Sequence, residues 1–205
     1  MVPPLVRIAT RLFPPEVAAA AFRERLLADA LVRAGAEVEV ITTVPPETAG
    51  PADDGDLLVR RLPAMRDVNG NIRGYVQYLS YDLPLVFRAV TRRRPDVWIV
   101  EPPPTTGGVI RLVTMLQRRP YVWYAADIWS DAAGSAGAPA ALVALLRQVE
   151  VRVMRGALCV LSISGAVTAR LGALGVDVAR VATVGNGVDT SVFTPNGPIH
   201  KPVDS

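Results

Sequence analysis

Short apolar runs that alternate with longer helical segments constrain the fold of this chain more than any other feature of its sequence. The runs at residues 97–100 and 158–161 are continuously apolar, with the letters VWIV and LCVL. A strand that is apolar at every position is typical of a parallel sheet covered by helices on both faces. The pattern therefore predicts an α/β fold of the Rossmann-like, doubly wound type, in which most strands are parallel.

The expected elements follow one another as strand and helix along the whole chain. Strands are expected at residues 5–10, 37–43, 57–62, 97–101, 121–125, 157–162 and 181–184. Helices are expected at residues 16–34, 75–93, 108–117, 139–154 and 165–174. On the first helix, Phe22 and Leu26 belong to the apolar face, and Glu24 belongs to the charged outer face. Gly35 follows this helix, where it is expected to form a left-handed C-terminal cap.

A length of 205 residues allows one domain of this kind and is too short for two. We expect the domain to cover residues 1–190 and a linker or tail to cover residues 191–205. No apolar run approaches the roughly 18 to 20 residues that a membrane span needs, so a cytoplasmic location is expected. The arginine run at residues 92–94 complements the dipole at a helix end, and it also suits contact with anionic lipid headgroups.

Scarce residue types exclude several classes of chemistry. The chain has one histidine, His200, and one lysine, Lys201, both in the C-terminal tail, and its single cysteine is Cys159, which is expected to be a core residue. Phosphate-binding loops of the Walker type need a lysine, triad hydrolases need a histidine base, and zinc sites need several His or Cys ligands. We therefore expect no metal and no cofactor. A net charge of +3 and the lack of a basic stripe with interleaved aromatic residues predict no nucleic-acid partner.

Residues just after each strand are the candidates for a site, because ligands of doubly wound sheets bind beyond the carboxyl ends of the strands. Glu101 and Asp127 stand at two such ends, where partial desolvation favours a raised carboxyl pKa and a base or hydrogen-bonding role. Asp127 equally suits an ordinary helix N-cap. The segment Thr-Thr-Gly-Gly at 105–108 suits either a bound phosphate or sugar oxygen or, again, simple capping.

The loop after the first strand lacks the GxGxxG motif of dinucleotide-binding domains. It carries four alanines at residues 18–21 instead, so no dinucleotide site is expected. Small side chains at a helix N-terminus still allow an anion to approach the backbone amides. A plain first helical turn explains the alanines equally well.

Several motifs, taken in order, resemble the N-terminal half of a family 4 glycosyltransferase with the GT-B fold. The first is the proline-rich loop Phe13-Pro14-Pro15-Glu16, followed by a helix and the strand segment GAEVEVIT at 35–42. The most specific is VGNGVD at 184–189 with Phe-Thr-Pro at 193–195. Arg73, the letters YLSY at 78–81 and ADIW at 126–129 further resemble a bacterial subgroup that builds O-antigen, capsule and related polysaccharides.

The resemblance covers about residues 5–195 and implies a role for particular positions. It implies that Asp127 faces the reaction centre, where it orients or deprotonates the acceptor hydroxyl. The other substrate-binding positions fall into three implied groups, near the donor diphosphate, on the acceptor side and at the interdomain cleft. These groups are Glu16, Ala18 and Ala19; Arg73, Tyr78, Ser80 and Glu101; and Asn186 and Gly187.

The function that the resemblance implies is the acceptor-binding half of a retaining, metal-independent glycosyltransferase. Its donor would be a nucleoside-diphosphate sugar, and its acceptor a saccharide or a lipid-linked molecule at the inner face of the plasma membrane. In the family, a second domain that binds most of the donor would begin where this chain ends, so the isolated chain is expected to be inactive. Two alternatives stay open, a non-catalytic binding subunit completed by a separate chain and half of a nucleotide-sugar epimerase.

Overall fold

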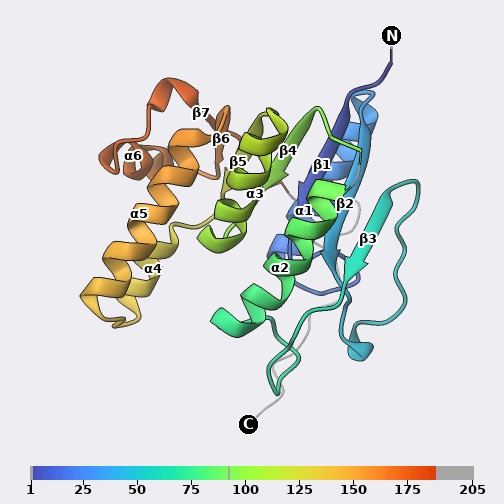
Figure 1. The fold of residues 1–205 in the computed structure, drawn as a ribbon, viewed down its shortest axis with the longest axis horizontal. Coiled ribbons are helices and arrows are strands. Elements are labelled where there is room, and N and C mark those ends of the chain that lie inside the picture. The colour runs from blue at the N-terminus through green and yellow to red at the C-terminus, as the bar shows by residue number, and fades with distance from the viewer. Residues whose placement is uncertain (1, 92, 188–205) are drawn as a thin grey trace, which may run out of the picture.

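The computed structural model describes residues 2–91 and 93–187, which form a seven-stranded sheet with helices on both faces (Figure 1). The strands are β1 (Leu5–Ala9), β2 (Glu37–Thr43), β3 (Leu58–Leu62), β4 (Val97–Val100), β5 (Tyr121–Ala125), β6 (Cys159–Ser162) and β7 (Val181–Thr183). Their spatial order is β3-β2-β1-β4-β5-β6-β7, and every neighbouring pair is parallel. The predicted doubly wound α/β fold is confirmed. The expected tail at 191–205, with its Phe-Thr-Pro motif, lies outside the described residues.

Six helices connect the strands within the described part of the chain. They are α1 (Ala19–Arg33), α2 (Tyr75–Thr91), α3 (Pro104–Gln117), α4 (Trp129–Ser135), α5 (Ala140–Gly156) and α6 (Gly165–Ala173). Two short 3-10 helices, η1 (Glu47–Ala49) and η2 (Val178–Arg180), complete the set. Figure 1 shows α2, α3 and α5 on the face of the sheet turned toward the viewer and α1 behind β1 and β2. Among the described residues, no helix has the length and the apolar character needed to cross a bilayer.

Each face of the sheet carries its own apolar core. On the face toward the viewer, which we call the front face, the core includes Trp98, Trp123 and Tyr81, all fully buried. On the back face, Val6, Ile8 and Val40 pack against Ala28 of α1. A parallel sheet needs this double cover because its strands are apolar on both sides.

The outer strand β6 departs from the sequence prediction that both of its faces are buried. Val160 is buried in the front core, but Cys159 and Leu161, which alternate with it, are only partly buried. The back core, which contains α1, includes no residue of β6 among the described residues. Cys159 is therefore a half-buried residue of an outer strand and not the core residue that the sequence suggested.

A buried ion pair joins the neighbouring strands β1 and β2. Arg7 of β1 and Glu39 of β2 stand opposite each other in register, and their side chains meet at 2.6 Å. Arg60 of β3 contacts the second oxygen of the same carboxylate. The Arg7 guanidinium also lies over the Trp98 ring, 5.1 Å from its centroid, and donates a hydrogen bond to the carbonyl of Arg93. Because a buried charge is costly without partners, these contacts hold Arg7 in place.

The structure buries Glu24, which the helical pattern placed on the outer face of the first helix. The buried residues of α1 are Ala21, Glu24 and Ala28, while Phe22, expected inside, is 38% exposed. The small alanines allow α1 to lie close to the sheet, and this orientation turns Glu24 inward. Burial, followed by the negative charge of Glu101, raises the pKa of the Glu24 carboxyl well above its ordinary value. By contrast, Gly35 has a φ of 88°, as its predicted capping role requires.

Helix α3 begins four residues earlier than predicted, so the Thr-Thr-Gly-Gly segment lies inside its first turns. The N-cap position is Pro103, which offers no side-chain cap. A Cβ added at Gly107 would lie 2.8 Å from a methyl carbon of Val153 and would overlap the Trp123 ring. At Gly108 the nearest atom would be 4.0 Å away. Gly107 is therefore required for contact between α3 and the front core, and Gly108 is not.

We predict opposite effects from adding one methyl group at these two neighbouring positions. Gly107→Ala should lower the free energy of unfolding by about 2–3 kcal/mol, because the ring and Val153 must shift to make room. Gly108→Ala should raise it by up to about 1 kcal/mol, because alanine favours a helix more than glycine does. Urea unfolding followed by circular dichroism measures both. Equal effects of the two changes would contradict the proposed packing.

We predict that Glu24→Gln stabilises the protein in a pH-dependent way. The folded state holds the Glu24 proton above the ordinary pKa of 4.5, whereas the unfolded state releases it there. The stability contributed by protonated Glu24 is therefore full below pH 4.5 and declines as the pH rises toward the raised folded pKa. Glutamine mimics the protonated form at every pH. The variant should exceed the wild type by on the order of 1–2 kcal/mol at neutral pH, and the difference should shrink toward pH 4, in urea unfolding at each pH. If the difference in unfolding free energy between the variant and the wild type did not change with pH, the raised pKa of Glu24 would be contradicted.

Candidate functional site

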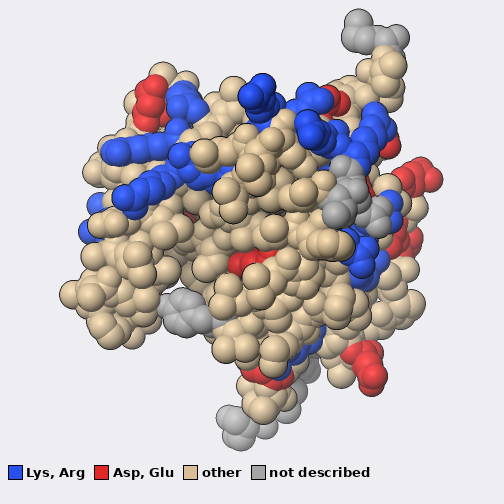
Figure 2. Space-filling model, viewed as in Figure 1, with Lys and Arg blue, Asp and Glu red and all other residues tan. Residues whose placement is uncertain are grey.

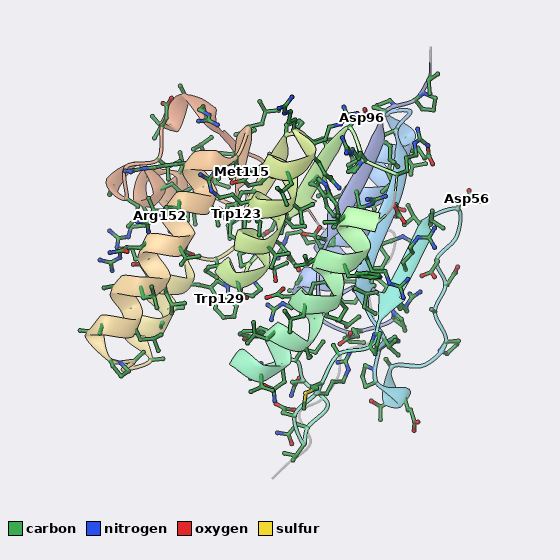
Figure 3. The ribbon with its side chains drawn as sticks, viewed as in Figure 1. Asp56, Asp96, Met115, Trp123, Trp129 and Arg152 are labelled. Atoms are coloured by element: carbon green, nitrogen blue, oxygen red, sulfur yellow. The ribbon has the colours of Figure 1, made fainter. Side chains whose placement is uncertain are left out.

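A cavity of about 450 Å³ opens at the carboxyl edge of the sheet, where the N-terminal ends of α2, α3 and α4 meet. Its walls are mostly apolar, from Pro103 and Pro104 of α3 and Leu146 of α5, with alanines of α4. The polar groups that line it come from Asp127 and Thr105, and its aromatic groups come from Tyr78 and Trp129. Figure 3 shows Trp129 at the lower end of the helical layer, between α4 and α2. Apolar walls with a few convergent polar groups are typical of a small-molecule site.

Arg11 holds the two aromatic side chains of the cavity together. Its guanidinium carbon lies 4.1 Å from the centroid of the Tyr78 ring and 5.8 Å from that of Trp129. The two rings meet edge to face, with their centroids 5.5 Å apart. Arg11 is only 8% exposed and donates a hydrogen bond of 3.3 Å to the carbonyl of Pro102. This places a desolvated positive charge directly behind the aromatic wall of the cavity.

This role of Arg11 was not predicted from the sequence. The residues just after each strand were candidates for a site, and Arg11 is the second residue after β1 ends at Ala9. The position is where the strand order reverses, because β1 pairs with β2 on one side and with β4 on the other. That topological position is the signal that would have identified it.

Asp127 lines the cavity and is exposed there, so the predicted desolvation of its carboxylate is not observed. The alternative role, capping the following helix, is also wrong. The N-cap of α4 is Ile128, and the first amides of the helix donate to the Glu150 carboxylate, from Trp129 at 2.7 Å and from Ser130 at 3.1 Å. Glu150 is fully buried, and burial raises its pKa. Since Glu150 caps the helix, the Asp127 carboxylate is available to a ligand in the cavity.

Glu101 lies elsewhere than the sequence suggested. It is 6% exposed and is not among the residues that line the cavity of Asp127. Its carboxylate accepts hydrogen bonds from the Thr10 hydroxyl and, at 3.3 Å, from Arg23 of α1. The Arg23 guanidinium in turn lies 5.1 Å from the centroid of the Tyr124 ring. Glu101 therefore belongs to a buried cluster that attaches α1 to the sheet.

The two threonines at the start of α3 differ in their surroundings. Thr106 donates a hydrogen bond of 2.6 Å to Asp82 of α2, whose pKa is raised by burial. This bond joins α2 to α3 and has no capping role. Thr105 lines the cavity, but its hydroxyl oxygen is buried and lies near the Asp82 carboxylate, whose pKa it helps to lower against the effect of burial.

The loop after β1 has its acidic residue already paired. Glu16 meets Arg66 in a two-armed contact, with nitrogen to oxygen distances of 2.8 and 3.0 Å. Ala18 is the N-cap residue of α1 and Ala19 its first residue, and neither provides a side-chain cap. Nearby, Arg61 makes a similar contact with Asp54, at 2.7 Å for both bonds.

The remaining predicted site residues do not gather at the cavity. Arg73 is exposed beside Gly74, which lines the cavity, but Arg73 itself does not line it. The Ser80 hydroxyl accepts from the amide of Met65 and donates to the carbonyl of Gln77, so it fixes the loop before α2. Asn186 and Gly187 are exposed after β7.

The chain after β7 passes close to the back-face helix. A Cβ added at Gly187 would lie 3.8 Å from a side-chain carbon of Leu26 in α1. Of the residues to which the family resemblance gave a role, the structure brings Tyr78 and Asp127 together in the cavity, and the candidate Thr105 lines it as well. In residues 2–91 and 93–187, no group of three His, Cys, Asp or Glu side chains could hold a metal ion.

Solved structures share this fold over nearly the whole chain. Sucrose-phosphate synthase from Thermosynechococcus elongatus superposes with a TM-score of 0.71 at 14% identity, over 94% of this chain and 50% of its own. A Listeria monocytogenes protein named as a UDP-N-acetylglucosamine 2-epimerase gives a TM-score of 0.65 at 18% identity, over 98% and 50%. Anabaena HepE in complex with UDP and glucose gives 0.57 at 15% identity, over 93% and 47%. The chain thus spans about half the length of each of these proteins.

Sequence comparison is more specific than the shared fold. No curated protein matches the chain in sequence. Residues 19–187, however, match the model of the family described as the glycosyl transferase 4-like domain. The match covers most of the chain. The chain therefore belongs to the glycosyl transferase 4-like domain family, with the fold of a GT-B N-terminal domain.

Proposed function

We propose that this domain is the acceptor-binding half of a retaining glycosyltransferase. Its donor would be a nucleoside-diphosphate sugar and its acceptor a saccharide or lipid-linked molecule, as in the synthesis of bacterial polysaccharides. We place the enzyme in the cytoplasm, in peripheral contact with the inner face of the plasma membrane when the acceptor carries a lipid. The second domain would supply most of the donor site, and neither a metal nor a cofactor takes part.

The observation that carries this proposal is the combination of an exposed carboxylate and an aromatic wall in one cavity. Asp127 stands on one side, and Tyr78 and Trp129, backed by Arg11, stand nearby. The apolar face of a sugar ring packs well against aromatic rings, and a carboxylate is a strong acceptor for a sugar hydroxyl. The cavity thus offers both contacts that a saccharide acceptor needs.

Glycosyl transfer forms a bond between the acceptor oxygen and the anomeric carbon of the donor sugar. It breaks the bond from that carbon to the diphosphate, which leaves with the bonding electrons and takes up the proton of the acceptor hydroxyl. Asp127 would accept a hydrogen bond from the acceptor hydroxyl and orient its oxygen toward the anomeric carbon. Tyr78 and Trp129 would hold the ring that carries this hydroxyl. The proposed role of Asp127 is therefore one of positioning at the reacting oxygen.

Three paired arginines near the loop after β1 support the proposal that the second domain, and not this one, binds most of the donor. Arg23 is paired with Glu101, Arg61 with Asp54 and Arg66 with Glu16. A bound diphosphate would have to break these pairs to gain their charge. This half of the enzyme should therefore contribute little to nucleotide affinity by itself.

A second candidate is half of a nucleotide-sugar epimerase. The observation in its favour is the superposition on the Listeria protein named as a UDP-N-acetylglucosamine 2-epimerase. An epimerase needs no acceptor, so a domain from one would bind a nucleotide sugar and show no affinity for a free saccharide. The two experiments below separate these candidates.

We predict that glycolipid binding requires Asp127. Trp98 and Trp123 are fully buried, so Trp129 is the tryptophan whose fluorescence should respond to a ligand in the cavity. Titration with octyl glucoside and octyl N-acetylglucosaminide, both below their micelle concentrations, should change the emission. Asp127→Ala should weaken binding about 10- to 100-fold, because a hydrogen bond to a charged group is lost.

Two variants control this titration. Asp56→Ala removes an exposed carboxylate from a loop on the other side of the molecule and should leave affinity unchanged (Figure 3). Trp129→Phe keeps an aromatic wall and should abolish the signal, with binding still detected by calorimetry. Equal affinities for the Asp127 and Asp56 variants would remove Asp127 from the site.

We also predict that UDP binds this chain with a dissociation constant of about 1 mM or weaker, because Arg23, Arg61 and Arg66 near the β1 loop are already paired with carboxylates. Isothermal calorimetry with UDP and with UDP-N-acetylglucosamine measures this directly. Micromolar affinity for either, without glycolipid binding, would contradict the acceptor-half proposal and favour the epimerase.

A further inference from the structure

A second cavity, a groove of about 480 Å³, follows the outer side of α5. Its lining residues recur at helical spacing, so they share one side of this helix. They are Ala144, Arg147, Gln148, Val151, Arg152 and Arg155. Figure 3 shows Arg152 at the left of α5. We call this cavity the α5 groove. Within the described part of the chain, its lining contains arginines but no acidic and no aromatic residue.

Two arginines of the α5 groove have only neutral partners. Arg152 donates a hydrogen bond of 3.3 Å to the side-chain oxygen of Gln148, and Arg155 donates one of 2.9 Å to the carbonyl of Gly175. No ion pair with a described acidic residue is found for either. Because a neutral acceptor does not cancel the charge of a guanidinium, both side chains can still pair with an anion.

The third arginine of the groove has a weak ion pair. Arg147 lies 3.7 Å from the carboxylate of Asp131. That carboxylate already accepts two hydrogen bonds of 2.7 Å from Arg170, which lower the pKa of Asp131. Arg170 is therefore the main partner of Asp131, and the charge of Arg147 also remains available to a ligand.

The helices around the groove carry no exposed carboxylate. The one acidic residue of α5 is Glu150, which is fully buried, and the sequence of α6 contains none. Figure 2 shows blue side chains at the upper left of the view, where Figure 1 draws α5 and α6. This side of the molecule therefore attracts anions.

The lining of the α5 groove favours one class of anion. Proteins that bind single-stranded nucleic acid stack the bases on aromatic side chains, which the lining lacks. A helix that lies in a membrane interface needs large apolar side chains, whereas the apolar part of this lining is Ala144 and Val151. Arginine pairs with a carboxylate through two parallel hydrogen bonds, and the Gln148 amide can bond to hydroxyl groups. Together these groups suit a chain of sugar rings that carry carboxylates.

The groove begins beside the cavity that we propose for the acceptor. Leu146 of α5 lines that cavity, and the next residue, Arg147, lines the groove. Arg147 also contacts Asp131 of α4, the helix whose alanines line the cavity. From Arg147 to Arg155 the groove follows about 12 Å of helix, at 1.5 Å per residue. A saccharide whose terminal ring occupies the cavity would therefore meet the arginines with its following rings.

We propose that the α5 groove binds the acidic part of the acceptor, a saccharide chain whose carboxylates pair with Arg147, Arg152 and Arg155. This inference rests on the proposed function, because it makes the groove an extension of the acceptor site. The terminal ring lies in the cavity beside Asp127, and the rest of the chain follows α5. The groove thus selects acidic chains over neutral ones.

Calorimetry with saccharides of defined length tests this proposal without a donor or a second domain. Hexagalacturonate should bind with a dissociation constant below about 1 mM at low salt. Maltohexaose, a neutral chain of equal length, and galacturonate, a single acidic ring, should each bind at least about 10-fold more weakly, because neither can form several ion pairs at once. Equal affinity for the two hexamers, or no binding of either, would overturn the proposal.

Matched charge reversals locate the site. Arg152→Glu should weaken the binding of hexagalacturonate about 5- to 10-fold, because it removes one ion pair and adds a repulsion. Arg33→Glu makes the same change of charge in the last turn of α1, on the back face, and should alter affinity less than about 2-fold. Thermal unfolding followed by circular dichroism checks that both variants are folded. Equal losses would show that the net charge of the protein, and not the groove, attracts the saccharide.

A peptide of six glutamates tests the alternative partner, an acidic protein segment. It presents carboxylates without sugar rings, so it should bind more weakly than hexagalacturonate. If it binds as tightly or more tightly, the groove is not a saccharide site and the proposal is wrong.

The octyl glycoside titration separates a failure of this inference from a failure of the proposed function. Binding of octyl glycosides through Asp127, without binding of hexagalacturonate, would overturn the groove and leave the acceptor-half proposal standing. The reverse result, binding of hexagalacturonate that depends on Arg152 without binding of octyl glycosides, would contradict the proposed function. The groove would then remain a site for acidic saccharides.

Discussion

The parallel pairing of β1 with both β2 and β4 is the constraint on which the rest of the structure depends. Because all seven strands point the same way, each connection must return to the opposite edge of the sheet, along helices everywhere except between β2 and β3, and the loops after the strands emerge at one edge. The strand order reverses beside β1, so the loops after β1 and β4 diverge to opposite faces there. Beside this point Arg11, which follows β1, donates a hydrogen bond to the carbonyl of Pro102, which follows β4, and lies behind the aromatic wall of the cavity.

The carboxyl edge of the sheet has two parts. In one part, pairs of arginine and acidic side chains hold segments together, and in the other part the cavity is open to a ligand. Around α1 and the loop after β1, the pairs Arg23–Glu101, Arg61–Asp54 and Arg66–Glu16 use the available charges to hold segments together. At the cavity the arrangement is different. Arg11 contacts aromatic rings and a carbonyl, and Asp127 is exposed while Glu150 caps α4 in its place. The proposed acceptor site involves α2, whose first turns reach the cavity.

The candidate site could be predicted only in part from the sequence. Asp127 and Tyr78 were expected there because strand ends and family motifs are local patterns, and both line the cavity. Glu101, like Asp127, directly follows the end of a strand. Its side chain nevertheless contacts Arg23 of α1 on the back face, whereas Asp127 lines the cavity on the front face. No local pattern distinguishes these two carboxylates. The capping role of Glu150 could not be predicted from local sequence either. Glu150 lies 21 and 20 positions along the chain from the two residues whose amides donate hydrogen bonds to it.

What the sequence determined by itself was the class of fold, the family and the order of the elements except α4, which was not predicted. Apolar periodicity, glycine turns and short motifs depend on neighbours along the chain. The tertiary structure decided which face each element turns inward. Glu24 was assigned to an outer face from its charged neighbours, but the alanines of α1 bring a different side of the helix against the sheet and bury it. On α2, the apolar pattern alone could not show which side would meet the core. Helical spacing gives relative positions around an axis, and only packing against the sheet sets the rotation of that axis.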